Sequence, residues 1–360
     1  MLNTVQNSGT HTLAFVVLCL LALTVPAAAQ TSQQQEYKVK VHVELVTAAL
    51  TVTDASGQFV PGLQPTDFEI YDNGQLQKIE QFQPIPQPIS MVILVNTSDK
   101  LEPLLPRLQK LGILFADLVL GQTGEAAVVE FDNEIRVSQG FTSDANQLIA
   151  TLKRVRAGGR GSRLVDAMSR ALLMLRDRKP DRRKVIVIIS GPEDRGSESK
   201  LGEPLREAQL NDVAVYTIGL SPLEAALLAK PESQPSPFPP GTMPTPGIPG
   251  SVHTPTTQQA PQVNLMAAIV MLVQSLRNTL GENPLKLYAA GTGGAYFPTL
   301  SKSSLEEAVN RIGQELHNQY VITYRLTNAD WGFHEISARV LRPGLIARTR
   351  PGYYIGPPEP

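Results

Sequence analysis

The segment Met91-Val92-Ile93-Leu94-Val95-Asn96-Thr97-Ser98-Asp99-Lys100 decides the fold of this chain. Five apolar residues are followed at once by polar ones, which is typical of a buried parallel strand that ends in a loop. In open α/β sheets, ligands bind in the crevice beyond the carboxyl ends of such strands. The segment therefore predicts a parallel sheet and the edge of it at which a site lies.

Residues 90–225 alternate between apolar strands and amphipathic helices. Strands are expected at 90–95, 125–131, 184–190 and 214–220, with a hairpin at Asp132-Asn133 after the second, and helices at 104–119, 145–155, 162–176 and 201–210. This alternation predicts an α/β fold with a doubly wound, mainly parallel sheet and helices on both faces. The sheet pattern is expected to resume at 285–294 and 295–297, before an amphipathic helix at 305–318.

Antiparallel β segments are expected on both sides of this α/β region. Valine-rich alternation from Tyr37, with Ser56-Gly57 and Asn73-Gly74 turns, predicts an N-terminal β module over 37–84. Further strands are expected over 319–355. Because each flank alone is small for a stable sheet, we expect them to pair into one β sandwich, with residues 88–318 inserted as the α/β domain.

The α/β domain also carries an insertion. Residues 231–262 are rich in Pro, Gly, Thr, Ser and Gln, a composition that predicts a loop. An added helix is expected at 263–280, and its apolar side either packs on the domain or binds a partner.

The N-terminus predicts export. Residues 1–29 contain no charged residue and include an apolar run from Leu13 to Leu23 before Ala27-Ala28-Ala29, which indicates a signal peptide cleaved after Ala29. An uncleaved anchor is the alternative, although it needs about 20 apolar residues. The expected location is periplasmic, cell-envelope or secreted, with no integral span after cleavage. The only cysteine, Cys19, lies in this segment, so disulfides are not expected.

Four segments follow one another along the chain: Asn96-Thr97-Ser98 after its strand, the glycine-rich stretch from Gly158 to Ala167, Val187 to Asp194, and Val215-Tyr216-Thr217-Ile218-Gly219. In this order they resemble von Willebrand factor type A (VWA) domains. The flanks resemble a bacterial group of VWA-related proteins common in acidobacteria. The matching flank segments are Val60-Pro61-Gly62-Leu63, Asp67 to Gly74, Gly293 to Phe297, Gln319-Tyr320, Arg342 to Leu345 and Pro351 to Tyr354.

The resemblance implies a metal-ion-dependent adhesion site, but with altered chemistry. Such a site holds a divalent cation between an Asp, two Ser, a Thr and a second Asp, and Mg²⁺ suits these oxygen ligands. The aligned positions here are Asn96, Ser98, Lys100, Ser162 and Gly191. Both carboxylates are missing, and an ammonium about 4 Å from a divalent ion would be repelled by roughly 8 kcal/mol at an effective dielectric constant near 20. The resemblance therefore implies a degenerate site and no cofactor.

Three alternatives remain open at these positions. Asp99, Glu193 and Asp194 lie close in sequence to the lost ligands and could bind Mg²⁺ or Ca²⁺ as displaced carboxylates. The Lys100 ammonium could instead occupy the metal position, hydrogen-bonded to Asn96, Ser98 or Ser162. In the third alternative, Lys100 points into solvent and the loop is structural.

The sequence does not predict an enzyme. The histidines after residue 29 show no ligand spacing, and no nucleophile, base and orienting residue occur as a set. The net charge of −1 argues against a basic nucleic-acid-binding face. The expected function is an exported protein-binding module of adhesion or assembly type that works without metal. Divalent-cation-dependent adhesion and a structural scaffold of the cell envelope are the alternatives.

Overall fold

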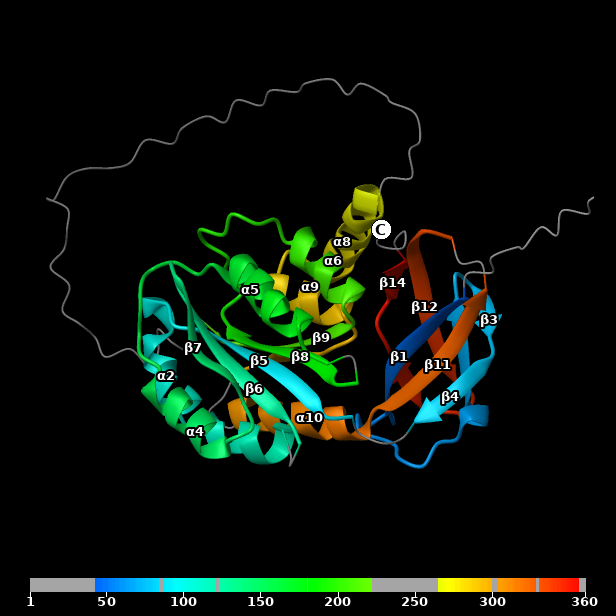
Figure 1. The fold of residues 1–360 in the computed structure, drawn as a ribbon, viewed down its shortest axis with the longest axis horizontal. Coiled ribbons are helices and arrows are strands. Elements are labelled where there is room, and N and C mark those ends of the chain that lie inside the picture. The colour runs from blue at the N-terminus through cyan, green and yellow to red at the C-terminus, as the bar shows by residue number, and fades with distance from the viewer. Residues whose placement is uncertain are drawn as a thin grey trace, which may run out of the picture. The chain divides into compact units, whose positions relative to one another are not determined.

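The computed structural model describes residues 43–83, 87–120, 123–179, 181–221, 265–299, 304–327 and 330–355. They form a layered α/β part and an antiparallel β sandwich, which lie next to each other in Figure 1. The predicted signal peptide (1–29) and the Pro-rich insertion (231–262) lie outside the described residues.

A six-stranded sheet forms the centre of the α/β part, in the order β10-β9-β8-β5-β6-β7. Neighbouring strands are parallel except β6 and β7, which form the hairpin expected at Asp132-Asn133. The predicted mainly parallel sheet is therefore confirmed, and its four central strands begin and end within one residue of the expected positions. The strands are β5 (Ile89–Asn96), β6 (Glu125–Phe131), β7 (Ile135–Thr142), β8 (Arg183–Ser190), β9 (Val213–Gly219) and β10 (Tyr296–Pro298).

Helices cover both faces of this sheet, because its central strands are apolar on both sides. Met91, Ile93 and Val95 of β5 belong to one core, and Val92 and Leu94 belong to the other. The first core is covered by α2 (Leu105–Leu108), α3 (Leu111–Leu114), α4 (Ala145–Arg154) and α10 (Ser304–Asn318). The second is covered by α5 (Leu164–Arg176), α6 (Gly202–Leu210), α8 (Leu265–Leu280) and α9 (Pro284–Gly291).

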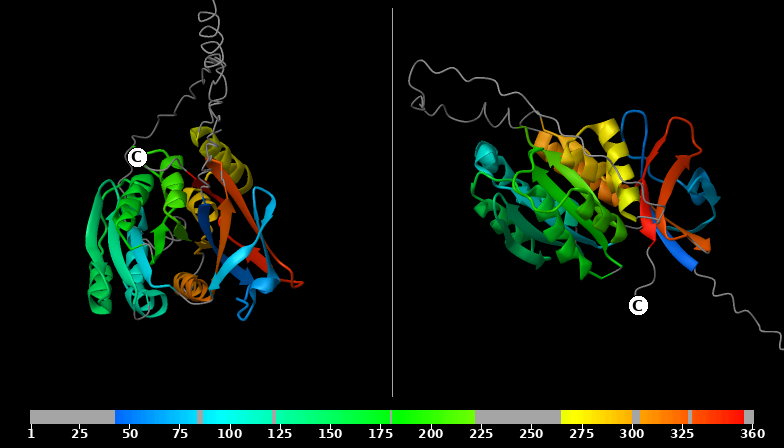
Figure 2. Two further views of the ribbon diagram at one scale, coloured as in Figure 1. Left: turned by 45° about the vertical axis from the view of Figure 1, so that its right-hand side comes forward. Right: turned by 90° about the horizontal axis from the view of Figure 1, so that it is seen from above.

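The sandwich consists of two four-stranded antiparallel sheets, in the orders β13-β1-β11-β4 and β14-β12-β2-β3. Each sheet contains strands from both flanks of the α/β part, so the predicted pairing of the flanks is confirmed. Figure 2 shows the sandwich beside the helices and sheet of the α/β part. Its strands are β1 (Val43–Thr53), β2 (Phe68–Asp72), β3 (Gln75–Gln77), β4 (Ile79–Gln83), β11 (Tyr320–Thr327), β12 (Gly332–Val340), β13 (Ile346–Arg348) and β14 (Gly352–Ile355).

Local sequence signals account for the sandwich turns. Asn73 and Gly74, at φ 48° and 76°, connect β2 to β3, since a tight hairpin turn with two positive φ angles favours Asn-Gly. Tyr320 fixes the Val60–Leu63 loop, because its hydroxyl donates to the Val60 carbonyl at 2.7 Å and accepts from the Leu63 amide at 3.0 Å. Flank motifs that are distant in the sequence thus contact each other.

A buried polar cluster connects the sandwich to the α/β part. One carboxylate oxygen of Glu315 in α10 accepts hydrogen bonds from Thr51 of β1 at 3.1 Å and from Tyr216 of β9 at 2.9 Å. Arg348 of β13 forms an ion pair with the same oxygen. Burial, together with the Glu315 charge, raises the pKa of Tyr216, so its hydroxyl keeps the proton that it donates.

The prediction of a strand at 285–294 is wrong: this segment contains helix α9. The Asn283 side chain accepts a hydrogen bond from the Leu285 amide at 3.0 Å, and Pro284 occupies the first turn. These are helix-start signals. Leu285, Tyr288 and Ala289 are buried at helical spacing, so the apolar run reflects a short buried helix.

Two expected helices also differ from the structure. The segment 104–119 is interrupted: a 3₁₀ turn (Asp99–Leu104) precedes α2 and α3, and a π-helical stretch (Phe115–Leu120) follows them. Pro103 lies in the 3₁₀ turn, and Pro106 lies in the first turn of α2, where a missing amide hydrogen is tolerated, so the prolines account for the start of α2 but not for the later interruptions. The helix expected from residue 162 begins at Leu164, because Ser162 forms an isolated β-bridge with Arg195.

The added helix is present as α8 over 265–280. Val273 packs in the second core, and the helix contacts α6 and α9. Among the described residues, every helix is too short or too polar to span a bilayer.

Candidate functional site

Four loops meet at the carboxyl edge of the parallel sheet, and we call them the loop face: residues 96–100, 132–134, 158–163 and 190–199. Backbone hydrogen bonds join them. The Gly158 amide donates to the Thr97 carbonyl at 2.7 Å, and the Asp99 amide donates to the Gly159 carbonyl at 3.0 Å. The Arg163 amide donates to the Asp132 carbonyl at 2.9 Å. The loops therefore form one connected surface.

Asn96 lies at the centre of the loop face and is 2% exposed. The Ser98 amide donates to Asn96 Oδ1 at 2.8 Å, which orients the side-chain amide. Asn96 Nδ2 then donates to Ser162 Oγ and to Ser190 Oγ, both at 2.9 Å. Ser162 Oγ in turn donates to the Glu193 carbonyl at 2.8 Å. An NH₂ group with partial positive charge thus lies between two hydroxyl oxygens.

The other aligned positions lie around this amide. Ser98 is buried, but its side chain caps no helix amide. Gly191 follows Ser190 and offers no side-chain ligand. The loop face therefore brings Asn96 into contact with Ser162 and with the Ser98 amide, while Gly191 follows Ser190, which Asn96 also contacts.

Lys100 does not occupy the metal position. Its ammonium forms an ion pair with Glu193 at 3.1 Å, at the surface, where both side chains are more than 40% exposed. Arg195 binds the same Glu193 oxygen at 3.0 Å. The hypothesis of an internal ammonium bound to Asn96, Ser98 or Ser162 is wrong, because Lys100 reaches a carboxylate that attracts it more strongly than neutral hydroxyls do.

The remaining nearby carboxylates have partners of their own. Asp99 lies 3.6 Å from the guanidinium of Arg160, whose side chain is 95% exposed. Asp194 accepts from the Val165 amide at 3.1 Å and from Ser197 Oγ at 2.7 Å. Among the described residues, no group of three or more His, Cys, Asp or Glu side chains is arranged to hold a metal ion.

Asp132 contacts the glycine-rich loop at Gly158 and Gly159 and stabilises it. The sequence did not predict this residue as part of the site. It is 1% exposed, and Arg136 forms an ion pair with it at 2.6 Å. Burial opposes ionisation of Asp132, but hydrogen bonds from Arg136 and from the Glu134 and Gly159 amides outweigh it and lower the pKa to about 2. A Cβ at Gly158 would lie 1.8 Å from Asp132 Oδ2, so this close approach requires glycine.

Asp166 performs a similar role at the start of α5. Burial raises its pKa, but the Ser199 and Glu198 amides and the Arg163 guanidinium stabilise the charged form and lower the pKa to about 2. Arg163 donates to it at 2.7 Å and 2.9 Å. Asp166 thereby holds the 190–199 loop against α5.

Ser190 was also missed as a site residue, although the strand register gives a signal for it. Val95 of β5 pairs with Ile189 of β8, and Asn96 pairs with Phe131 of β6. Ser190 therefore ends β8 at the level of Asn96, and Asp132 follows β6 one residue further, at the level of Thr97. Polar residues at one level of adjacent parallel strands meet at the sheet edge.

Part of the chain is similar to a known protein family. Residues 91–193 match the family described as von Willebrand factor type A domain. No curated protein matches the chain. The match includes most of β5, Ser162 and the end of β8, and so covers the loop face up to residue 193.

Solved structures resemble the chain only distantly. The conserved hypothetical protein BatB from Bacteroides thetaiotaomicron has 13% identity and a TM-score of 0.40, covering 63% of this chain and 98% of that chain. An aerotolerance-related membrane protein from Bacteroides fragilis has 15% identity and a TM-score of 0.40, with the same coverage. The SpRpn10 VWA domain has 16% identity and a TM-score of 0.31, covering 39% and 79%. At these TM-scores the structures carry no argument, and it is the family match that supports a von Willebrand factor type A domain over residues 91–193.

Proposed function

We propose that this chain is an exported, non-enzymatic protein-binding module of adhesion or assembly type, whose loop face binds its partner without a divalent cation. VWA domains mediate protein interactions, and the loop face occupies the edge of the sheet at which α/β folds bind ligands. Binding without a divalent cation is supported by one observation: Asn96 Nδ2 lies between Ser162 Oγ and Ser190 Oγ and donates to both.

The residues at the loop face do not fit a divalent cation. A cation needs oxygen lone pairs directed at it. Here the hydroxyl oxygens of Ser162 and Ser190 accept from an amide NH₂, and the Asn96 oxygen accepts from the Ser98 amide. Binding a metal would break these bonds in a site without an aligned carboxylate. The two Nδ2 hydrogens of Asn96 bind the hydroxyl oxygens that would otherwise be available to a cation.

The surface around Asn96 suits protein recognition better than catalysis. Asp99, Lys100, Arg160, Glu193 and Arg195 place charges of both signs on the rim, and all are partly or fully exposed. A polar, charged rim around a rigid centre is typical of non-obligate protein interfaces. We take this surface, together with the absence of a nucleophile–base set among the site residues described above, as support for binding over catalysis.

Export and membership of the bacterial VWA-related group are further parts of the proposal. The charge-free apolar segment before Ala29 supports export. The flank motifs support the group, because they contact each other in the sandwich: Tyr320 binds the Val60–Leu63 loop, and Arg342 binds Asp67 with two bonds of 2.8 Å. These contacts give the resembling segments a common structural role.

Photo-crosslinking tests the proposal. A benzophenone amino acid at Arg160 should capture a partner from the source envelope equally well in EDTA and in magnesium. The same label at Leu341, an exposed position on the sandwich (49%), serves as the control and should not capture it. Capture that requires magnesium would contradict the metal-free part of the proposal. Equal capture at Leu341 would contradict the assignment of the binding surface to the loop face.

A further inference from the structure

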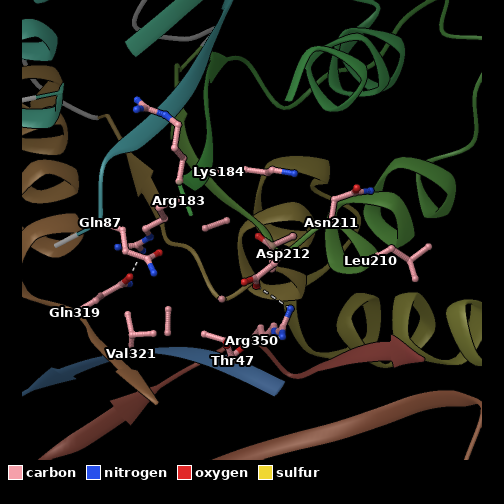
Figure 3. A pocket seen from close by; sticks show the side chains of 15 residues that line it. Thr47, Gln87, Arg183, Lys184, Leu210, Asn211, Asp212, Gln319, Val321 and Arg350 are labelled. Carbon is pink, nitrogen blue, oxygen red and sulfur yellow. Dashed lines mark hydrogen bonds and ion pairs between the residues drawn. The ribbon is translucent and has the colours of Figure 1, made fainter. Parts of the chain in front are cut away.

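A second candidate binding site lies at the opposite edge of the parallel sheet. A cavity of about 410 Å³ opens at the amino ends of β8 and β9, where they approach β1 and β11 of the sandwich (Figure 3). Thr47, Ala49 and Val321 line it on the sandwich side, and Arg183, Lys184 and Asp212 line it on the α/β side. Its residues are separate from the loop face.

The cavity carries an excess of positive charge. Its lining includes four cationic side chains and one carboxylate, that of Asp212. One cation, Arg182, is already paired with Glu125 at 3.4 Å. This leaves Arg183, Lys184 and Arg350 against Asp212 alone. A partly enclosed positive surface concentrates anions.

The three remaining cationic side chains differ in how many hydrogen-bond and ion-pair partners they already have. Arg350 donates to Asp212 at 2.8 Å and to the Thr47 carbonyl at 2.8 Å, and its buried Nε has no hydrogen-bond partner. Arg183 donates to the Leu316 carbonyl at 3.1 Å and to Gln319. Lys184 forms no ion pair within the part of the chain that the structure describes. Lys184 therefore has its charge available to a ligand.

The backbone of β1 adds donors to the same cavity. The Thr47 and Ala49 carbonyls point away from β11, since Arg350 donates to the first and Thr349 Oγ1 to the second at 3.0 Å. In a β-strand, the amide and carbonyl of one residue point to the same side. The Thr47 and Ala49 amides therefore point toward this side too, where β13 pairs with β1 only over Thr51–Thr53.

Two acceptors in the cavity are already occupied, while the Lys184 ammonium and the β1 amides remain as donors. The Thr47 carbonyl is bound by Arg350, and the Gln319 side-chain oxygen is bound by Arg183. A ligand that offers acceptors and negative charge complements such a surface, because charged acceptors form the strongest hydrogen bonds with ammonium and amide donors. A cavity of this size lies in the range of small-molecule sites, roughly 300–1,000 Å³.

We propose that this cavity binds a small organic oxyanion, in which Lys184 and the β1 amides contact carboxylate or phosphate oxygens. The site is independent of partner binding at the loop face. Asp212 competes with the ligand for Arg350, so its charge limits the affinity. Carboxylate and phosphate share this chemistry, and the choice between them is left to the experiment.

Isothermal titration calorimetry of the full chain with citrate and with inorganic phosphate, at constant ionic strength, measures the dissociation constants that test this site. Lys184→Gln should weaken binding about tenfold, the effect of one charge-assisted hydrogen bond. Asp212→Asn should tighten binding several-fold, since it frees Arg350. Asn is suited to φ 52° at this position, so the backbone is preserved. Preferential binding of citrate or of phosphate identifies the ligand class.

The matched control is Lys153→Gln, on α4 and away from the cavity, which should leave binding unchanged. Opposite effects of the Lys184 and Asp212 variants support the proposal, because a general loss of folding cannot tighten binding. Absence of binding by both anions overturns it. Equal effects of Lys184→Gln and Lys153→Gln also overturn it, since they would indicate non-specific charge screening.

Discussion

Replacing Asn96 by Asp tests the interpretation of the loop face as a metal-free hydrogen-bonded centre. The substitution keeps the size and shape of the side chain but turns the donor Nδ2 into an acceptor oxygen. Ser162 and Ser190 would then each lose the donor that lies 2.9 Å away. The new carboxylate would be 2% exposed and without a cation, because Lys100 is engaged by Glu193.

The expected loss of stability follows from these contacts. Two lost hydrogen bonds cost about 1 kcal/mol each. An unpaired buried charge costs roughly 3–5 kcal/mol, although rotation of the serine hydroxyls and the Ser98 amide offset part of this. We expect a net decrease in the free energy of unfolding of about 3–5 kcal/mol at pH 7. Because burial raises the pKa of an unpaired carboxyl, the decrease should shrink toward pH 5.

Urea unfolding followed by far-UV circular dichroism measures this difference in EDTA at both pH values. Asn146→Asp, at an exposed position in the first turn of α4, is the matched control and should change stability by less than about 0.5 kcal/mol. If Asn96→Asp is as stable as the parent at pH 7, the amide is not the group that holds the hydroxyls, and the reasoning is refuted.

Three further predictions concern stability and folding. Asp132 and Asp166, each with a folded pKa of about 2 against 3.8, stabilise the fold by roughly 2 kcal/mol apiece above pH 4. This stability should be lost as pH falls from 4 to 2, and Asp132→Asn should flatten the decline in a urea titration. Asp72→Ala should lower the free energy of unfolding by about 3 kcal/mol or more, because the buried Tyr324 and Tyr353 hydroxyls each donate to Asp72 at 2.7 Å. Asp54→Ala, in an exposed turn, is the control and should lower it less. Residues 88–318 expressed alone, and the two flanks joined to each other, should each unfold cooperatively. If residues 88–318 fold but the joined flanks do not, the prediction that the α/β domain is inserted in the sandwich is weakened.

The strand layout could be predicted because it depends on local pattern. The run from Val185 to Ile189 is apolar at every position, and in a strand covered on both faces every one of these side chains is buried. The 285–294 segment has a similar composition, and the Asn283-Pro284 signal that distinguishes a helix is only two residues long. Short apolar runs do not separate buried helix from buried strand by periodicity alone.

The members of the site could be predicted better than its bonds. Asn96 and Ser162 were expected at one edge because each ends a strand or begins a helix there. The direction of the Asn96 amide depends on one contact, the Ser98 amide on Oδ1, and that contact is a property of the folded loop. The Lys100–Glu193 ion pair joins residues that are far apart in the sequence, and its geometry depends on two flexible side chains at the surface.

Thermal unfolding of residues 30–360 in EDTA, and then in excess magnesium, calcium or manganese, tests the central claim most directly. We expect no shift in the midpoint, because amide hydrogens occupy the position at which a cation would bind. The triple variant Asn96→Asp, Lys100→Ser, Gly191→Asp restores the missing ligands and should gain a shift. A cation at 100 times its dissociation constant stabilises a fold by about 2.7 kcal/mol. A shift of that size in the parent, abolished by Asp99→Ala or Asp194→Ala, would contradict the claim.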